Sequence, residues 1–373
     1  MKFLLRVMGL IFAALILVLT GWVKIHQEGV GPSLMAFTRE GMFNGTNTLI
    51  TAPGVAWRRL IGPRTIAEAH LTWSADGKRL AFEGWQNGNI DIFSISRTGQ
   101  DGRNLTQHYA FDTAPNWSPD GQWIAFNSDR EGNAEVFIMH PDGSDTRNIS
   151  NFAGRDYDPA WSPDGKQIAY VSVREGHPQI LRAGMEGGDP QWLASGFSPA
   201  WSPDGKRIAF VYELNRDNQD VYVMQADGTG IENLSARWGL DFGPVWSPDG
   251  QWVVFSAAYG AQFEICKVRI GSTDLHCLAR HPGHDLSPSW SPNGEWIAFI
   301  STRGGNREVF AVRPDGSKLT NVSAWGGRGC VSSVVAAAAL YTGEPSSGGE
   351  RGSVGNVGDA HLAERFEEWR QSC

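Results

Sequence analysis

The chain has 373 residues, of which 41% are hydrophobic and 19% are charged. This apolar share excludes an intrinsically disordered chain and is typical of a globular protein. The formal net charge is −8 and no basic stripe is present, which argues against nucleic acid as the main partner.

Residues 1–24 are predicted to form one hydrophobic helix. Lys2 and Arg6 precede an apolar run over residues 7–23, and Lys24 follows it. A run of about 17 residues is at the lower limit for crossing a bilayer. No A-x-A cleavage site follows the run, so we favour an uncleaved membrane anchor over a cleaved, secreted form. Both alternatives place the rest of the chain outside the cytoplasm, in the periplasm or the extracellular space.

Residues 25–56 are expected to form a linker. The stretch is short, and its surroundings are rich in glycine. Within it, residues 33–40 could form two helical turns.

Residues 57–325 repeat one pattern with a fixed period. Trp-Ser-Pro-Asp-Gly or a near-copy recurs six times at intervals of 40 to 45 residues. A period in this range is typical of a repeat architecture. The tryptophans that mark the copies are Trp73, Trp117, Trp161, Trp201, Trp246 and Trp290.

Each copy predicts four short antiparallel strands. In the third copy a strand ends at Trp161, and residues 163–165 form a tight turn because proline presets φ and glycine permits unusual φ. Residues 167–172, rich in β-branched and aromatic side chains, give the second strand. Four strands per copy describe one propeller blade, and such blades must stack around an axis to bury both faces. We expect each tryptophan to fill the space between neighbouring blades.

The pattern Trp-Ser-Pro-Asp-Gly-Lys-x-Ile-Ala-Phe, followed by an Asp-Gly turn and an Asn-Leu-Ser/Thr strand, resembles the repeat of TolB-type β-propellers. The resemblance covers residues 57–325 and implies an all-β propeller of six four-stranded blades. It also implies docking of a protein partner at the cell envelope. TolB-type proteins carry an α/β domain before the propeller, for which residues 25–56 leave no room. We therefore carry over the mode of binding and not the partner.

The number of blades depends on one spare outer strand. Six copies contain the first three strands, whereas residues 57–62 give a seventh copy of the fourth strand. Either residues 58–61 complete the sixth blade, or a seventh blade follows the sixth. The tryptophan of such a blade is expected at position 334, where Val334 stands instead.

Residues 326–373 are expected to form a low-complexity tail, because their composition changes to glycine, serine and alanine. Two alternatives remain open. The tail is genuine and carries one short amphipathic helix around Leu362, Phe366 and Trp369, or a shifted reading frame has truncated or altered a last blade.

An acidic residue recurs five positions before the blade tryptophan. By the symmetry of a ring, these carboxylates should surround one mouth of the central channel and attract a cation or a basic peptide. The alternative is that they cap backbone N–H groups. The residues are Glu68, Asp112, Asp156, Asp241 and Asp285.

Three arginines, Arg130, Arg174 and Arg303, lie in Ser-x-Arg-x-Gly loops and should share the face of the acidic ring. They could contact the same partner, or form salt bridges between neighbouring blades. With the acidic residues they make up the predicted partner-binding set.

Metal and cofactor signals are weak. His281, His284 and Asp285 have metal-like spacing, but they lie on one loop without a third element. Calcium would suit oxygen-rich loops, although no D-x-D-x-D-G loop is present. We therefore expect no cofactor.

Cys266 and Cys277 replace other residues of the repeat on the third and fourth strands of one blade. A two-residue hairpin at residues 271–272 would set them opposite each other, where a disulfide could form in an exported protein. The alternative is two small buried hydrophobic side chains.

Motifs of hydrolases, nucleotide-binding proteins and redox enzymes are missing, since the chain has no G-x-S-x-G, Walker loop, C-x-x-C or H-E-x-x-H. We predict a membrane-tethered binding module, not an enzyme, that docks a protein or peptide on one face of the ring. The alternative is a lyase or hydrolase acting on carbohydrate, with His281, His284, Asp285 and Arg303 at the channel mouth.

Overall fold

The structure is a computed structural model that describes residues 35–40, 46–51, 58–59, 68–86, 88–99, 101–305 and 307–322. Its strands form six four-stranded sheets and one three-stranded sheet. The predicted helix at residues 1–24 and the tail at residues 326–373 lie outside the described residues. In the part that is described, no helix has the length and hydropathy needed to cross a membrane.

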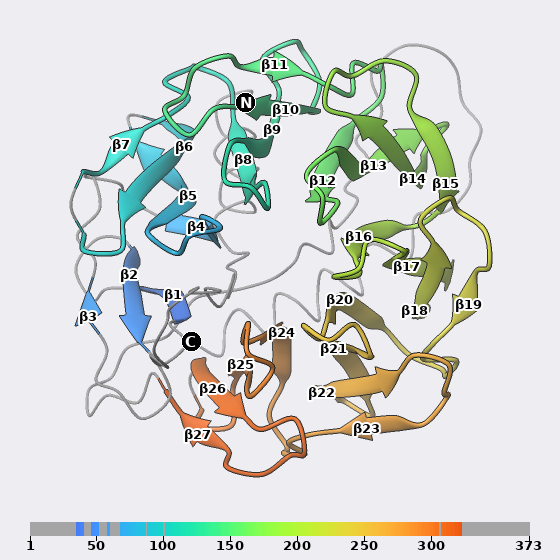
Figure 1. Cartoon of the computed structure of the whole chain (residues 1–373). Coiled ribbons are helices and arrows are strands. Elements are labelled where there is room, and N and C mark those ends of the chain that lie inside the picture. Colours follow the sequence, from blue (N-terminus) through green and yellow to red (C-terminus); the bar gives the residue numbers. More distant parts are fainter. Residues whose placement is uncertain are drawn as a thin grey trace, which may run out of the picture.

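The six four-stranded sheets are the blades of a propeller, which confirms the predicted all-β fold (Figure 1). The chain enters each blade at the innermost strand and leaves it at the outermost one. The innermost strands are β4 (Glu68–Trp73), β8 (Asp112–Trp117), β12 (Asp156–Trp161), β16 (Phe197–Trp201), β20 (Asp241–Trp246) and β24 (Asp285–Trp290). The second strands are β5 (Arg79–Gln86), β9 (Ile124–Ser128), β13 (Gln167–Arg174), β17 (Arg207–Asn215), β21 (Trp252–Tyr259) and β25 (Ile297–Ser301).

The outer half of each blade is built from a longer third strand and a short fourth strand. The third strands are β6 (Asn89–Ser96), β10 (Glu135–Met139), β14 (His177–Gly184), β18 (Asn218–Gln225), β22 (Gln262–Arg269) and β26 (Glu308–Val312). The fourth strands are β7 (Arg103–Asn104), β11 (Arg147–Asn148), β15 (Gln191–Ser195), β19 (Glu232–Asn233), β23 (Leu275–Cys277) and β27 (Thr320–Asn321).

The Trp-Ser-Pro-Asp-Gly turn is stabilised by its own side chains. In the third blade, Ser162 Oγ donates to Asp164 Oδ1 over 2.6 Å, and the same oxygen accepts the N–H of Lys166 over 3.1 Å. Gly165 has a φ of 69°, which a residue with a Cβ rarely adopts. The turn therefore needs its serine, aspartate and glycine, and this requirement explains why they recur.

Blade tryptophans lie between blades, as predicted. Trp117 is 7% exposed and belongs to a cluster that includes Ala81 and Ile92 of the first blade and Phe126 of its own. The indole of Trp161 also donates to the carbonyl of Asn116 in the preceding blade over 3.0 Å. Apolar burial and a hydrogen bond thus hold neighbouring blades together.

A further sheet is formed by β1 (Met35–Glu40), β2 (Thr46–Thr51) and β3 (Arg58–Arg59), in the order β1-β2-β3. The helical turns expected at residues 33–40 are therefore wrong for 35–40, because pairing with β2 fixes that segment as a strand. Two strands lie in the stretch expected to be a linker. Completion of the sixth blade by residues 58–61 is also wrong, because β3 pairs with β2 and β27 already pairs with β26.

Candidate functional site

The ring has two faces that differ in the connections they carry. On one face lie the hairpins between second and third strands, together with the loops that lead from one blade to the next. We call it the hairpin face. The Trp-Ser-Pro-Asp-Gly turns lie on the opposite face, because each innermost strand runs from an inter-blade loop to such a turn.

The predicted acidic residues lie at the start of the innermost strands, but they do not line an open mouth. Asp112, Asp156, Asp241 and Asp285 are all 0% exposed. Burial raises the pKa of Asp112, and it raises the pKa of Asp156, Asp241 and Asp285 to about 6. Carboxylates so deeply buried cannot touch a partner directly. Glu68 is the first residue of β4, and its side chain lies outside the described part.

Arginines of the hairpin face neutralise three of these carboxylates. Arg130 Nη2 lies 3.1 Å from Asp112 and Arg303 Nη2 lies 2.7 Å from Asp285, each within one blade. The expected salt bridges between neighbouring blades are therefore wrong for these two arginines. Asp241 is paired with Arg237, which the sequence analysis did not single out.

Arg174 differs from the other two arginines of the repeat. Its Nε donates to Ser172 Oγ over 3.3 Å, and its guanidinium lies 4.1 Å from the centre of the Phe152 ring. No ion pair joins it to Asp156 among the described residues, and both carboxylate oxygens of Asp156 lack a hydrogen-bond partner there. The three arginines thus stabilise the hairpins by pairing and stacking.

His281 and His284 do not converge on a common point. His281 Nδ1 accepts the N–H of Gly283 over 3.1 Å, whereas His284 Nδ1 accepts the N–H of Phe263 over 3.3 Å. Burial lowers the pKa of His284. Asp285 is already paired with Arg303. These contacts do not favour a zinc site or an acid–base site at this loop.

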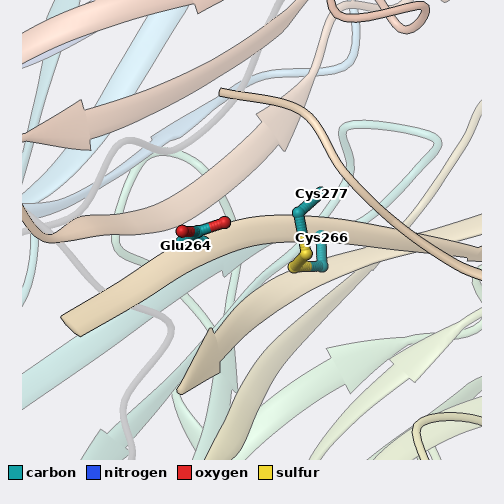
Figure 2. A group of neighbouring side chains, drawn as sticks. All are labelled: Glu264, Cys266 and Cys277. Carbon is teal, nitrogen blue, oxygen red and sulfur yellow. A yellow bond between two sulfur atoms is a disulfide. The ribbon is translucent and has the colours of Figure 1, made fainter. Parts of the chain in front are cut away.

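Cys266 and Cys277 are joined by a disulfide between β22 and β23, where the two residues are direct register partners (Figure 2). The connection is longer than the expected two-residue hairpin, since it spans residues 270–274. Glu264 lies close enough to the sulfurs to form the one group of three metal-type ligands in the described residues. Because both sulfurs are bonded to each other in the disulfide, they are not thiolate ligands, and this group is not a metal site.

Large apolar side chains on the hairpin face are exposed over the fourth and fifth blades. We call Tyr212, Leu214, Trp238 and Tyr259 the blade 4/5 patch. Trp238 is 72% exposed and Leu214 is 47% exposed. Exposed apolar side chains on neighbouring hairpins and loops of one face are typical of interaction sites.

Hydrogen bonds fix the position of Trp238 between two hairpins. The N–H of Gly239 donates to Asn218 Oδ1 over 2.9 Å in the fourth blade. Arg237 Nη1 donates to the carbonyl of Ala258 over 2.6 Å in the fifth blade. The loop is therefore held from both sides, and Trp238 is presented to solvent on a rigid support.

The sequence analysis missed the blade 4/5 patch. Trp238 does not belong to the Trp-Ser-Pro-Asp-Gly repeat, and it stands in an inter-blade loop. A further feature of the patch is the length of β17, which has nine residues and ends in a run of exposed residues. An aromatic residue outside the repeat pattern was the available clue.

The opposite face has a cavity of about 1430 Å³ at the turns of the first four blades. Its walls include the Trp117, Trp161 and Trp201 rings and several prolines. Its acidic groups are engaged in their own turns, as Asp76 and Asp120 accept backbone N–H groups at 3.0 Å. The cavity is therefore built mainly from repeat residues.

The innermost strands approach the axis of the ring (Figure 1). A polar cluster, made of His70, Glu83 and Asp158, lies at the bulges of two of these strands and on a neighbouring strand. Each innermost strand has a bulge, and the residue there has positive φ, as in His70 (43°) and Asp158 (61°). His70 Nδ1 lies 2.5 Å from Glu83 Oε1, which also accepts the N–H of Ala114 over 2.5 Å.

The groups of this cluster influence each other across the ring. Burial alone would lower the pKa of His70, but Glu83 and, less strongly, Asp158 hold that pKa above its ordinary value. Burial raises the pKa of Asp158 to about 6, against the opposing effects of His70 and Ser198. The sequence analysis missed the cluster because bulges break the two-residue alternation of a strand.

Comparisons with known proteins agree with the fold. A family model described as the TolB beta propeller domain matches residues 58–152 and 196–340. No curated protein matches the chain at a significant level.

Solved structures with the same fold come from proteins of different activities. A putative TolB from Agrobacterium tumefaciens is 24% identical, with a TM-score of 0.50 over 60% of this chain and 84% of its own. TolB from Acinetobacter baumannii is 16% identical, with a TM-score of 0.53 over 80% and 81%. An oligogalacturonate lyase in complex with manganese is 16% identical, with a TM-score of 0.58 over 78% and 84%. At these identities the likeness concerns the fold alone.

Proposed function

Since the chain belongs to the TolB β-propeller domain family, we propose that it is a binding module that docks a protein partner on its hairpin face. The observation that carries the proposal is the blade 4/5 patch, in which Trp238 is exposed by 72% on a loop held by two hairpins. A few residues carry most of the binding energy of a protein interface, and tryptophan and tyrosine are enriched among them.

The surroundings of the patch suit a protein partner. The guanidinium of Arg280 lies 4.8 Å from the centre of the Tyr259 ring. Glu213 and Asp217, which are close to Leu214 in the sequence, are exposed. An apolar centre with a polar rim is the usual anatomy of a protein interface. In this proposal the buried aspartates and their arginines hold the hairpins in place and do not contact the partner.

The proposed location is outside the cytoplasm, with the propeller tethered to a membrane by residues 7–23. The apolar run of those residues supports the tether. The disulfide between Cys266 and Cys277 supports an oxidising compartment, because cytosolic thiols are kept reduced. A partner in the cell envelope follows from this location.

The docking face can be tested by site-specific photo-crosslinking. A benzoylphenylalanine probe replaces Trp238, or, as the matched control, Trp192, which is 55% exposed but stands on the outermost strand β15. Illumination in envelope extract should give a defined adduct from position 238 only. Trp238→Ala should then lower capture of the identified partner by roughly tenfold or more, as for an interface hot spot, and Trp192→Ala should not. Equal adducts from both positions, or none from position 238, would reject the proposed face.

A second candidate function, an enzyme acting on carbohydrate, is favoured by the cluster of His70, Glu83 and Asp158. A histidine oriented by a carboxylate can act as a general acid or base, and a neighbouring carboxyl with a pKa of about 6 can exchange a proton near neutral pH. The test is release of unsaturated products from oligogalacturonides, measured by ultraviolet absorbance, with His70→Ala as the control. Absence of turnover by the unaltered protein would leave that substrate class without support.

A further inference from the structure

An acidic residue recurs on the third strands, where an asparagine of the fourth strand donates to it. In the first blade, Asn104 Nδ2 donates to Asp91 Oδ2 over 2.8 Å, and in the fourth blade, Asn233 Nδ2 donates to Asp220 Oδ2 over 2.8 Å. Both aspartates are buried. The amide therefore supplies a hydrogen bond to a carboxylate that is shielded from water.

The fifth blade departs from this arrangement. In the first blade the acidic residue stands two positions before the third-strand residue that pairs with the asparagine, and Glu264 has the same relation to Cys266 and Cys277. Cys277 therefore stands where other blades have the asparagine donor. Glu264 is 2% exposed, and its Oε2 has no hydrogen-bond partner among the described residues. Arg280 Nε, at 3.7 Å from this oxygen, is too far away to donate a hydrogen bond.

Replacement of the asparagine brings a carboxylate and two sulfurs together. Glu264 and Cys266 lie two residues apart on β22, so they share one face of the sheet. Cys277 is the direct register partner of Cys266 on β23. One carboxylate oxygen of Glu264 and the two sulfurs lie within 4.8 Å of one another (Figure 2).

Two cysteines and a glutamate make a zinc ligand set once the sulfurs are thiolates. Zinc binds thiolate sulfur at about 2.3 Å and carboxylate oxygen at about 2.1 Å, so ligand atoms around a tetrahedral ion lie about 3.5 to 4 Å apart. Rotation about the side-chain bonds of Glu264 can close the remaining difference of about 1 Å. A bound cation would also give Glu264 Oε2 the partner that it lacks.

We propose that the reduced chain binds Zn²⁺ through the sulfurs of Cys266 and Cys277 and a carboxylate oxygen of Glu264, with water as the fourth ligand. Reduction by a dithiol transfers two electrons and two protons to the disulfide, and the reductant becomes a disulfide itself. Zinc then displaces the two thiol protons, which pass to solvent. A disulfide oxidant reverses both steps and releases the ion, so the disulfide and the metal exclude each other. This proposal is independent of the docking function.

The site can be tested by zinc binding to the full chain in detergent, in a background of Cys330→Ser and Cys373→Ser that leaves only the two site cysteines. One sample is reduced with a phosphine and kept free of oxygen, and the other stays oxidised. After gel filtration, mass spectrometry of the metal measures zinc per chain. The reduced chain should hold about one zinc ion, and the oxidised chain less than about a tenth of that. Cobalt in place of zinc should show the near-ultraviolet absorption of a metal bound to thiolate.

Three variants identify the ligands. Glu264→Gln should weaken zinc binding by about 100-fold or more, measured by competition with a chromophoric chelator, because it removes one of three protein ligands. Asp220→Asn is the matched control, since it changes the same repeat position in the fourth blade, where Tyr222 and Asn233 replace the two cysteines. It should leave zinc binding unchanged. Cys277→Asn restores the residue of other blades, so it should keep the fold, followed by circular dichroism, and lose the zinc.

Other outcomes contradict the proposal. Equal zinc in the reduced and oxidised chains, or zinc retained by Cys277→Asn, would show that the ion binds elsewhere. A reduced chain that holds no zinc, or that unfolds once the disulfide is broken, would show that reduction creates no site. A loss of affinity in Glu264→Gln no greater than in Asp220→Asn would remove Glu264 from the ligand set.

Discussion

Buried aspartates at the start of the innermost strands illustrate how one repeat position can have different partners. Asp285 has Arg303 at 2.7 Å, whereas the carboxylate oxygens of Asp156 have no hydrogen-bond partner in the described part of the chain. Both side chains are 0% exposed. The energetic effect of removing the charge should therefore differ between them.

Asp285→Asn should destabilise the protein by roughly 3 kcal/mol at pH 7.5, because it leaves the Arg303 guanidinium buried without its counter-charge. Asp156→Asn is the matched change and should alter the free energy of unfolding by less than about 1 kcal/mol, because it removes a buried charge that lacks a close ion pair. Urea unfolding curves of both variants measure the difference. Equal losses of unfolding free energy in the two variants would mean that the carboxylate stabilises the fold by capping backbone N–H groups and not by balancing the charge of an arginine.

The same carboxyls predict a pH dependence of stability. Asp156, Asp241 and Asp285 have pKa values of about 6 in the folded protein, above the ordinary value of 3.8. Between these pH values the folded state binds protons that the unfolded state has released. The free energy of unfolding should therefore fall as pH rises from about 4 to about 6.

Urea midpoints measured across this window check the sign. The lowered pKa values of exposed turn aspartates such as Asp164 act below about pH 4 and do not mask the effect. Asp156→Asn should reduce the slope. A midpoint that rises between pH 4 and 6 would contradict the prediction.

At the scale of elements, the turns between third and fourth strands link neighbouring blades. Gly143 has a φ of 89°, and a Cβ at this position would overlap the carbonyl oxygen of Leu105 in the outer strand region of the preceding blade. Gly176, in a hairpin of the third blade, has a similar φ of 82° but nothing within 4 Å of such a Cβ. A comparison of substitutions at the two glycines therefore separates the cost of backbone strain from the cost of disturbed packing between blades.

Gly176→Ala should cost about 1 kcal/mol, which is the strain of an alanine at positive φ. Gly143→Ala should cost more by about 2 kcal/mol, because the added methyl group also forces two blades apart. Thermal unfolding followed by circular dichroism measures both. Similar losses for the two variants would show that the turn moves freely relative to the neighbouring blade.

At the scale of the whole molecule, the proposed tether predicts where the protein is found. The full chain should sediment with membranes, resist extraction by high salt and dissolve in detergent, because residues 7–23 bury apolar side chains in the bilayer. A variant that begins at residue 25 behind a cleavable export signal should be soluble in the same compartment. Release of the full chain by salt alone would indicate a peripheral or cleaved form.

The sequence by itself determined the propeller, the six complete blades and the place of the six repeat tryptophans, because these follow from local turn chemistry repeated at a fixed period. Tertiary structure alone decided which recurring residues are exposed. The aspartates of the repeat are buried against arginines such as Arg303, while Trp238, outside the repeat, faces solvent. The physical reason is that burial depends on neighbouring loops and blades, which a repeat position does not encode. The same holds for β1–β3, which form a blade-like sheet only by pairing with one another beside β4.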